Sequence, residues 1–307
     1  MDRHSDSWVT RRTLFQGPLF EVGHVVCRPT PEVHTEVERA ELNVLALTTA
    51  GVWALHEGPR QHVIATPSHA VFISSGRSYR MSFPGYIGDE CIAMRLTAEG
   101  LSRLAPQAMA RDGFDGSVVA SRALLPPSAI LARGLLLRTL SPVGASPSPD
   151  PLLIEELAVG LLDSALAAVG ETRTAASVES KRNSPHVERV KEAISTSPER
   201  KWTLAELSGI AGISPCHLAH VFRREVGTPV YRYTIRLRLA TALNAVLDSD
   251  LDLTSIALDA GFASHSHFTA RFRALFGLTP DALRRTAGSG KAAELRKIVT
   301  ARQAVAA

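Results

Sequence analysis

The sequence predicts an α+β protein, with an N-terminal antiparallel β-barrel and flanking helices, and a C-terminal all-α domain containing two helix-turn-helix units. Three observations predict this class. Short apolar runs alternate with turn residues over roughly the first third of the chain. After about Leu101, apolar residues recur every three or four positions, as in amphipathic helices. In the last third, a pattern of two short helices occurs twice.

Size and composition exclude several classes of protein. The 307 residues exceed the usual size of a single core, which favours two domains. Apolar residues make up 45% and charged residues 21%, and no window approaches the ~18 apolar residues that a membrane span needs. The polar start MDRHSDSWVT lacks a secretory apolar core, so we expect a cytoplasmic location and no membrane partner. The three cysteines are too widely spaced for a disulfide framework or a cysteine zinc site.

The N-terminal third reads as short strands separated by Gly, Pro, Ser and Asp. Several strands alternate, with Tyr79, Met81 and Phe83 on one face and Arg80 on the other. Such even spacing is typical of a small antiparallel barrel or jelly roll. The predicted strands are residues 21–28, 42–48, 52–56, 62–65, 70–74, 79–83 and 91–97.

Two helices are predicted to follow, over residues 127–140 and 151–169. The second carries a broad stripe that includes Leu153, Leu157 and Leu161, which either packs on the barrel or forms a subunit interface. A polar, Ser/Thr-rich segment then predicts an interdomain linker. The expected domains are a barrel (1–120), a helical dimerisation or packing segment (121–170), a linker (171–185), a helix-turn-helix domain (186–287) and a flexible basic tail (288–307).

The first helix-turn-helix unit is marked by its helix caps. Thr203 with Glu206 three residues later forms a capping box, and Gly212 supplies a turn. Ser214 followed by Pro215 then begins a second helix. A polar and basic face on that helix is typical of a DNA-recognition helix.

The same unit recurs about fifty residues later. LAELSGIAG aligns with LTSIALDAG at an offset of 49, and SPCHLAHVFRREVG aligns with SHSHFTARFRALFG at an offset of 50. A single helix-glycine-helix pattern is common in α-helical proteins. Two copies with matched caps, cores and terminal glycines predict a tandem helix-turn-helix domain.

A predicted linker helix over residues 230–247 connects the two units. Ile235 and Leu239 are expected to face inward, and Arg232, Arg236 and Arg238 largely outward. Eighteen residues span roughly 27 Å, close to the ~34 Å turn of B-DNA. The net charge is +4, and residues 186–285 hold 13 basic and 10 acidic residues, so a polyanionic partner fits this region.

These residues resemble the AraC/XylS family of bacterial transcription regulators. The match spans residues 187–285 and is strongest in SIALDAGFASHSHFTARFRALFGLTPDALRR. The resemblance implies a sequence-specific regulator, usually an activator, that binds double-stranded promoter DNA and contacts RNA polymerase. It also implies recognition helices at residues 215–226 and 265–276. The residues expected at the DNA are Cys216, His217, Ala219, His220, Arg223, Arg224, His265, Ser266, Thr269, Ala270, Arg271 and Arg273.

The N-terminal half resembles the family only in its layout, which suggests a cupin-like effector-binding and dimerisation module. We therefore expect a small-molecule effector and a homodimer. Aromatic residues with a few polar groups on barrel strands commonly line small cavities, although core packing is the alternative role for each aromatic. The candidate effector residues are Arg28, His34, Trp53, His56, Tyr79 and Phe83.

Two other functions are compatible with the sequence. A metal-dependent cupin enzyme fused to a DNA-binding domain would use His34, Glu36 and Glu38 in an H-x-E-x-E pattern, with further histidines nearby. The expected second histidine of that cluster is absent, so we expect no metal, no cofactor and no enzymatic activity. The other candidate is a regulator controlled by a partner protein, which a closed barrel interior would favour.

Overall fold

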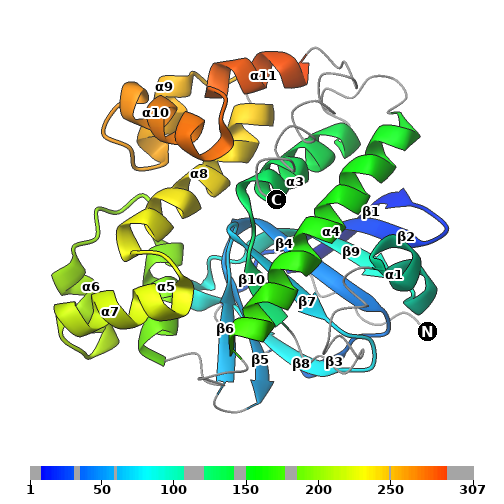
Figure 1. Cartoon of the computed structure of the whole chain (residues 1–307), viewed down its shortest axis with the longest axis horizontal. Helices are drawn as coiled ribbons and strands as arrows, with labels where there is room; N and C mark the ends of the chain where they lie inside the picture. Colours follow the sequence, from blue (N-terminus) through cyan, green and yellow to red (C-terminus); the bar gives the residue numbers. More distant parts are fainter. Residues whose placement is uncertain are drawn as a thin grey trace.

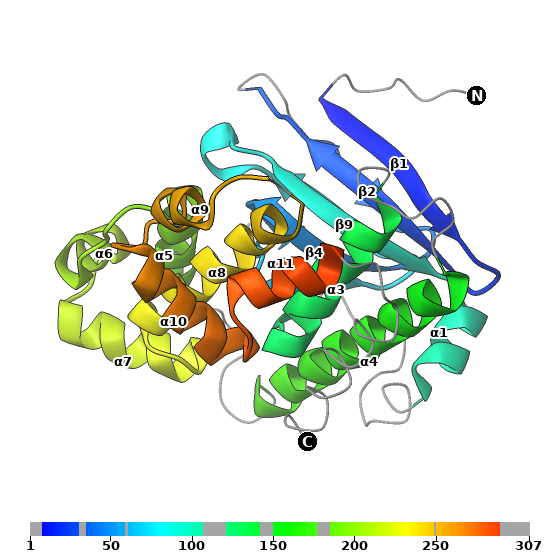
Figure 2. The same ribbon diagram turned by 90° about the horizontal axis from the view of Figure 1, so that it is seen from above.

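The computed structural model describes residues 8–30, 35–58, 61–106, 121–141, 150–176, 185–248 and 250–288. It contains two antiparallel sheets, two helices over one of them, and a helical C-terminal domain at the other end of the molecule (Figures 1 and 2). No helix in these ranges is long and apolar enough to cross a membrane.

The first sheet has six strands in the order β1-β2-β9-β4-β7-β10, and the second has four in the order β3-β8-β5-β6. Within the described ranges no strand pairing joins the two sheets, so they form an open sandwich and no closed barrel. The strands are β1 (Val9–Gln16), β2 (Phe20–Cys27), β3 (Glu38–Arg39), β4 (Asn43–Gly51), β5 (Trp53–Gly58), β6 (Gln61–Ala65), β7 (His69–Ile73), β8 (Ser78–Ser82), β9 (Asp89–Leu96) and β10 (Ser121–Leu124).

All seven predicted strands are present, within three residues of their expected ends. The sequence pattern does not predict β1, β3 and β10. β1 has two arginines and is largely exposed, because it lies at the edge of its sheet and pairs only with β2 among the described strands. β10 pairs with β7 at the opposite edge and begins more than twenty residues after β9 ends, so no hairpin signal indicates it.

The central strands β4 and β7 of the six-stranded sheet are buried on both faces. Because side chains alternate along a strand, Leu45 and Leu47 of β4 point to one face and Ala46 to the other. Ala46 belongs to the core between the sheets, together with Trp53 and Phe83. Leu45 and Leu47 pack in a second core under α3 (Pro127–Leu140) and α4 (Pro151–Ala176).

The leucine stripe of α4 is covered within one chain. Leu153, Leu157, Leu161 and Leu162 are buried in the core that includes the six-stranded sheet and α3. The packing alternative for this stripe is therefore the one observed. The helix also continues to Ala176, six residues into the segment expected as a linker. The rest of that segment, 177–184, and the tail from residue 289 lie outside the described residues.

The helices that follow α4 form the C-terminal domain, which contains the two predicted helix-turn-helix units. One short helix, α1 (Ala98–Leu104), lies outside this domain and follows β9. The C-terminal helices are α5 (Pro185–Thr196), α6 (Leu204–Ala211), α7 (Pro215–Val226), α8 (Val230–Asp248), α9 (Leu253–Asp259), α10 (His265–Phe276) and α11 (Pro280–Gly288).

The two units differ in how their cores are built. Leu207, Leu218 and Phe222 of the first unit form a separate core with α5 and one side of α8. Phe268 and Phe272 of the second unit belong to the same continuous core as the six-stranded sheet, α3 and α4. The second helix-turn-helix is thus joined to the N-terminal domain by apolar packing.

Candidate nucleic-acid interface

The first predicted recognition helix, α7, has one buried face and one exposed face. The Ser214 side chain accepts a hydrogen bond from the His217 amide (3.3 Å), and Gly227 ends the helix in the left-handed conformation. Leu218, Val221 and Phe222 fill the inner face. All six predicted DNA-facing residues are exposed: Cys216, His217, Ala219, His220, Arg223 and Arg224.

The second recognition helix, α10, repeats this design with a more aromatic core. Ser264 caps it through the His267 amide (3.2 Å), and Phe268, Phe272 and Phe276 are buried. The predicted residues Ser266, Ala270, Arg271 and Arg273 are exposed, whereas His265 and Thr269 are half-buried. His265, Ser266, Thr269, Ala270 and Arg273 line one shallow depression along the helix.

Side chains on α10 also contact one another. The Thr269 hydroxyl lies 3.3 Å from His265 Nε2, and Arg271 Nε donates to His267 Nε2 at 3.3 Å. The Phe262 ring packs edge-on against His267, with centroids 5.5 Å apart. His267 therefore lies on the flank of the helix, and Arg271 is positioned by it.

The linker helix α8 contributes less exposed charge than expected. Tyr233 and Leu237 pack in the core of the first unit, and Leu239 and Leu243 pack in the large core shared with the N-terminal domain. The prediction that three arginines lie largely outward holds only for Arg232, which is exposed. Arg236 is half-buried and Arg238 is buried. The residues around Arg236 and Arg238 belong to both helix-turn-helix units and to the N-terminal domain. The sequence pattern of α8 alone does not reveal these neighbours.

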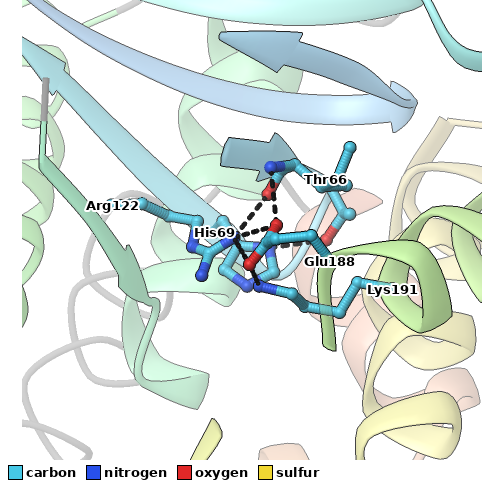
Figure 3. Close-up of polar contacts among 6 residues, drawn as sticks. Thr66, His69, Arg122, Glu188 and Lys191 are labelled. Carbon is cyan, nitrogen blue, oxygen red and sulfur yellow. Dashed lines mark hydrogen bonds and ion pairs between the residues drawn. The ribbon is translucent and has the colours of Figure 1, made fainter. Parts of the chain in front are cut away.

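A buried ion cluster connects α5 to the N-terminal sandwich (Figure 3). Glu188 accepts hydrogen bonds from Arg122 of β10 (3.0 and 3.1 Å), from Lys191 and from the Ile64 amide of β6 (3.1 Å). Burial alone would raise the pKa of Glu188, but Arg122 and Lys191 outweigh burial and lower this pKa to about 2. Burial, with added repulsion from Arg122, lowers the pKa of Lys191 to about 7.

His69 of β7 lies beside this cluster and is fully enclosed. Its Nδ1 atom is 2.8 Å from the Thr66 hydroxyl, and its ring lies 6.1 Å from the Tyr233 ring of α8. Burial, with repulsion from Arg122 and Lys191, lowers the pKa of His69 well below its usual value. Burial therefore favours the neutral form of this histidine at the contact between the sandwich and the linker helix.

A second contact connects α3 to α8 and α11. Arg133 is fully buried and donates to the carbonyls of Thr48, Pro67 (2.6 Å) and Ala240 (3.5 Å). Arg138 donates to the Leu247 and Ala287 carbonyls and pairs with Asp248. Gly134 allows the helices to approach, since a Cβ there would lie 2.9 Å from atoms of Leu243 and Leu247.

The sequence patterns do not predict the roles of Arg122, Arg133, Arg138, Glu188 and Lys191. A lone arginine in the apolar stretch AILARGLLL is a signal that could have found Arg133, because burying a charge is costly unless it is bonded. For the acidic and basic residues of α5, a spacing of three is ordinary on exposed helices and carries no comparable signal.

The described candidate effector residues lie in different environments. Trp53, Tyr79 and Phe83 contribute to the core between the sheets, and Trp53 Nε1 donates to the Thr48 hydroxyl (2.9 Å). The Tyr79 hydroxyl donates to Glu38 (2.9 Å), and His56 Nε2 lies 2.7 Å from the Ser82 hydroxyl. Arg28 is exposed and pairs with Glu90 (2.7 Å), and His34 lies outside the described residues.

The metal candidates are dispersed in the part of the chain that the structure describes. No three His, Cys, Asp or Glu side chains converge there as a metal ion would require. His56 and His62 are neighbours with ring centroids 5.6 Å apart, but His69 faces the C-terminal domain instead.

Comparison with known proteins places the similarity in the C-terminal domain. Residues 207–286 match a helix-turn-helix domain family. The chain is 36% identical over 107 residues to the HTH-type transcriptional regulator GlxA of Rhizobium meliloti, covering 35% of this chain and 33% of that protein. It is 32% identical over 136 residues to the XylDLEGF operon transcriptional activator of Pseudomonas putida, covering 43% and 42%.

A further relative also matches over only part of the chain. The chain is 32% identical over 83 residues to a putative AraC-like transcription regulator of Streptomyces lividans, covering 27% of each chain. The alignments span about a third of the length of the first curated relatives. Among solved structures, ToxT from Vibrio cholerae aligns over 87% of this chain and 98% of its own, at 11% identity and a TM-score of 0.37.

Proposed function

Since the chain belongs to the AraC/XylS family through its C-terminal domain, we propose that it is a sequence-specific, DNA-binding transcriptional regulator without enzymatic activity. The observation that carries the proposal is the pair of capped helices α7 and α10, each with a closed apolar core and an exposed polar, basic face. Such helices insert into the major groove of DNA.

The exposed residues of each helix divide into two roles. We assign base contacts to Cys216, Ala219 and His220 in α7, and to His265, Ser266, Thr269 and Ala270 in α10. Arg223 and Arg273 occupy equivalent positions in the last turns of the two helices, which suits phosphate contacts. Arg271 is exposed beside His267 and suits either a phosphate or a guanine edge. His217, His267 and Arg224 flank these positions.

The paired helices favour an operator with two short boxes. Recognition helices that enter successive major grooves on one face of the duplex need boxes about one helical turn, ~10 bp, apart. The regulator would act in the cytoplasm on promoter DNA, as an activator that contacts RNA polymerase and functions as a homodimer. Because the α4 stripe is covered within the protomer, we assign the dimer contact to another surface.

We assign control to the N-terminal sandwich, as a cupin-related module that binds a small effector. The contacts of α5 with β6 and of α8 with β4 support this role, because they connect the sandwich directly to the DNA-binding domain. The apolar packing of Trp53 and Phe83 between the sheets favours a second candidate, control by a partner protein that binds outside the sandwich.

Selection of bound sequences from a random duplex library by the full chain tests the proposal. We expect enrichment of one sequence with two boxes, and loss of binding when Arg223 and Arg273 are both replaced by alanine. Replacement of exposed Arg103 on α1 together with exposed Arg12 on β1 by alanine removes an equal charge at the far end of the molecule (Figure 1), and should leave binding unchanged. No enrichment at low salt would contradict the function.

A further inference from the structure

Arg238 lies in the middle of α8, between the two helix-turn-helix units. Its side chain is 8% exposed, and it extends into the gap between the segment that joins α5 to α6 and the turn that joins α9 to α10. A buried arginine is costly unless its donors are bonded. Nearly all of them are bonded here, and to both units.

Four backbone carbonyls accept hydrogen bonds from this guanidinium. Nε donates to Pro198 at 2.6 Å, and Nη2 donates to Glu199 at 3.2 Å and to Arg200 at 2.9 Å, all in the first unit. Nη1 donates to Gly261 at 2.7 Å, in the second unit. The guanidinium is planar with donors in a fixed fork. It therefore constrains where the Gly261 turn lies relative to residues 198–200.

The two units also touch directly at this point. A Cβ on Gly261 would lie 2.5 Å from the Glu199 carbonyl oxygen and 2.6 Å from its Cα atom. The equivalent glycine of the first repeat, Gly212, has the same left-handed backbone, with φ of 70° against 80°, but no neighbouring atom within 4 Å. Gly261 is thus required for contact between the units, whereas Gly212 is required only for its own turn.

This joint lies close to the start of both recognition helices. The α5–α6 segment leads into α6 at Leu204, and α7 follows after a short turn. The Gly261 turn is three residues from the Ser264 cap of α10. A shift of one turn relative to the other therefore moves one recognition helix relative to the other.

We propose that Arg238 is a positioning residue that fixes the distance and helical phase between α7 and α10, and so determines which spacing of two DNA boxes the protein accepts. This inference rests on the proposed function. One base pair changes the separation of two boxes by about 3.4 Å and their relative rotation by about 35°. The four hydrogen bonds of Arg238 resist such a change in the relative position of the two units. Without these bonds, the two units can adjust to a different spacing of the boxes.

The test measures binding of the full chain to operators that differ only in spacing. The selected two-box operator is rebuilt with zero to three base pairs inserted or deleted between the boxes, and affinities are measured by competition. We expect wild type to lose about tenfold, or about 1.4 kcal/mol, for one inserted or deleted base pair. Arg238→Met should flatten this profile to about threefold or less, and Arg238→Lys should lie between them.

Two glycine variants test the joint without changing charge. Gly261→Ala should shift or broaden the optimum spacing, because its Cβ cannot fit against Glu199. Gly212→Ala has the same backbone strain without the contact, so it should keep the wild-type profile. Arg232→Met removes an exposed charge from the same helix. It should leave the dependence of affinity on box spacing as in wild type.

The spacing profile separates the possible outcomes. Circular dichroism of each variant checks that it is folded. If Arg238→Met is unfolded, the spacing profile of Gly261→Ala is the one that tests the inference. An unchanged profile, or an equal loss at every spacing, in the folded Arg238 and Gly261 variants would overturn this inference and leave the proposed function standing. Wild-type protein that binds no duplex in the library would overturn both.

Discussion

At the scale of single residues, the same side-chain types have different roles depending on burial. Exposed arginines on α7 and α10 are available to phosphates, whereas Arg122, Arg133 and Arg238 are bonded inside the molecule. A buried charge costs desolvation energy, so its hydrogen bonds largely offset that cost instead of adding much net stability. Loss of one partner leaves a buried charge without its hydrogen bonds, which strongly lowers the free energy of unfolding.

Glu188 gives a prediction about acid stability. Its pKa in the folded chain, about 2, lies below the ordinary value of 4.5. Its stabilising contribution is therefore complete above about pH 4.5 and is lost as the pH falls towards 2. Glu188→Gln should lower the free energy of unfolding by about 3 kcal/mol at neutral pH, and the difference from wild type should shrink in acid.

Urea unfolding of both proteins between pH 7 and pH 3 measures this difference. Glu155→Gln on the exposed face of α4 is the control, and it should change stability by less than about 0.5 kcal/mol. A constant difference between Glu188→Gln and wild type across this pH range would contradict the assignment of the ion cluster.

The recognition residues give a prediction about sequence preference. His220→Ala and His265→Ala should each cost about 1 to 3 kcal/mol and relax preference at one operator position, in different boxes. Arg223→Ala should weaken binding to all sequences and reduce the slope of affinity against salt by about one. Competition with a randomised operator library at two salt concentrations measures both effects. Equal, position-independent losses for the two histidine variants would reject their base-reading role.

At the scale of elements, position in the layers decides what a helix face does. The apolar face of α4 covers the six-stranded sheet, and α8 has apolar contacts on two sides. The stripe on α4 therefore stabilises the protomer and is not free to form a dimer.

Two leucines of α4 test this assignment. Leu161 is fully buried and Leu152 is 57% exposed on the same helix. Leu161→Ala should lower the free energy of unfolding by about 2 to 5 kcal/mol, and Leu152→Ala by less than about 0.5 kcal/mol. Urea unfolding measures stability, and sedimentation measures the oligomeric state. If Leu161→Ala instead left protomer stability unchanged and only dissociated an oligomer, the packing assignment would be wrong.

At the scale of the whole molecule, the DNA-binding domain is attached to the sandwich at two places of different character. The first unit is held through the ion cluster at Glu188, and the second through apolar packing of α3 on α8 and α10. The exposed residues of α7 and α10 take part in neither contact. DNA binding and control can therefore occupy different surfaces.

A fragment starting at Asn183 tests this division. It contains both recognition helices, so it should bind the same operator as the full chain. It should also be less stable and bind an apolar dye, because it loses the cover that α3 provides to Leu243 and Leu247. Each fully buried leucine contributes about 1.5 to 3 kcal/mol.

Gel shift, thermal unfolding and dye fluorescence measure these properties beside the full chain. A folded fragment that binds no operator would contradict the assignment of α7 and α10. A fragment as stable as the full chain, without dye binding, would show that the α3–α8 contact adds no stability.

The sequence by itself determined the features that depend on near neighbours. The capping box of Thr203, the Ser214 and Ser264 caps and the terminal glycines are all present as predicted, because each joins residues only a few positions apart. The positions of seven of the ten described strands follow from the pattern of single segments. The two exposed recognition faces follow from helical periodicity, so most of the candidate DNA surface could be found from sequence.

Only the tertiary structure decided which faces meet across long separations. Arg238 and Pro198 are 40 residues apart, Glu188 and Arg122 are 66, and Arg133 and Ala240 are 107. The periodicity of α8 marks its apolar positions but not what covers them, so it predicts an outward Arg238 where the structure buries it. The open sandwich and the shared core of the second unit likewise depend on packing between elements that are distant in sequence.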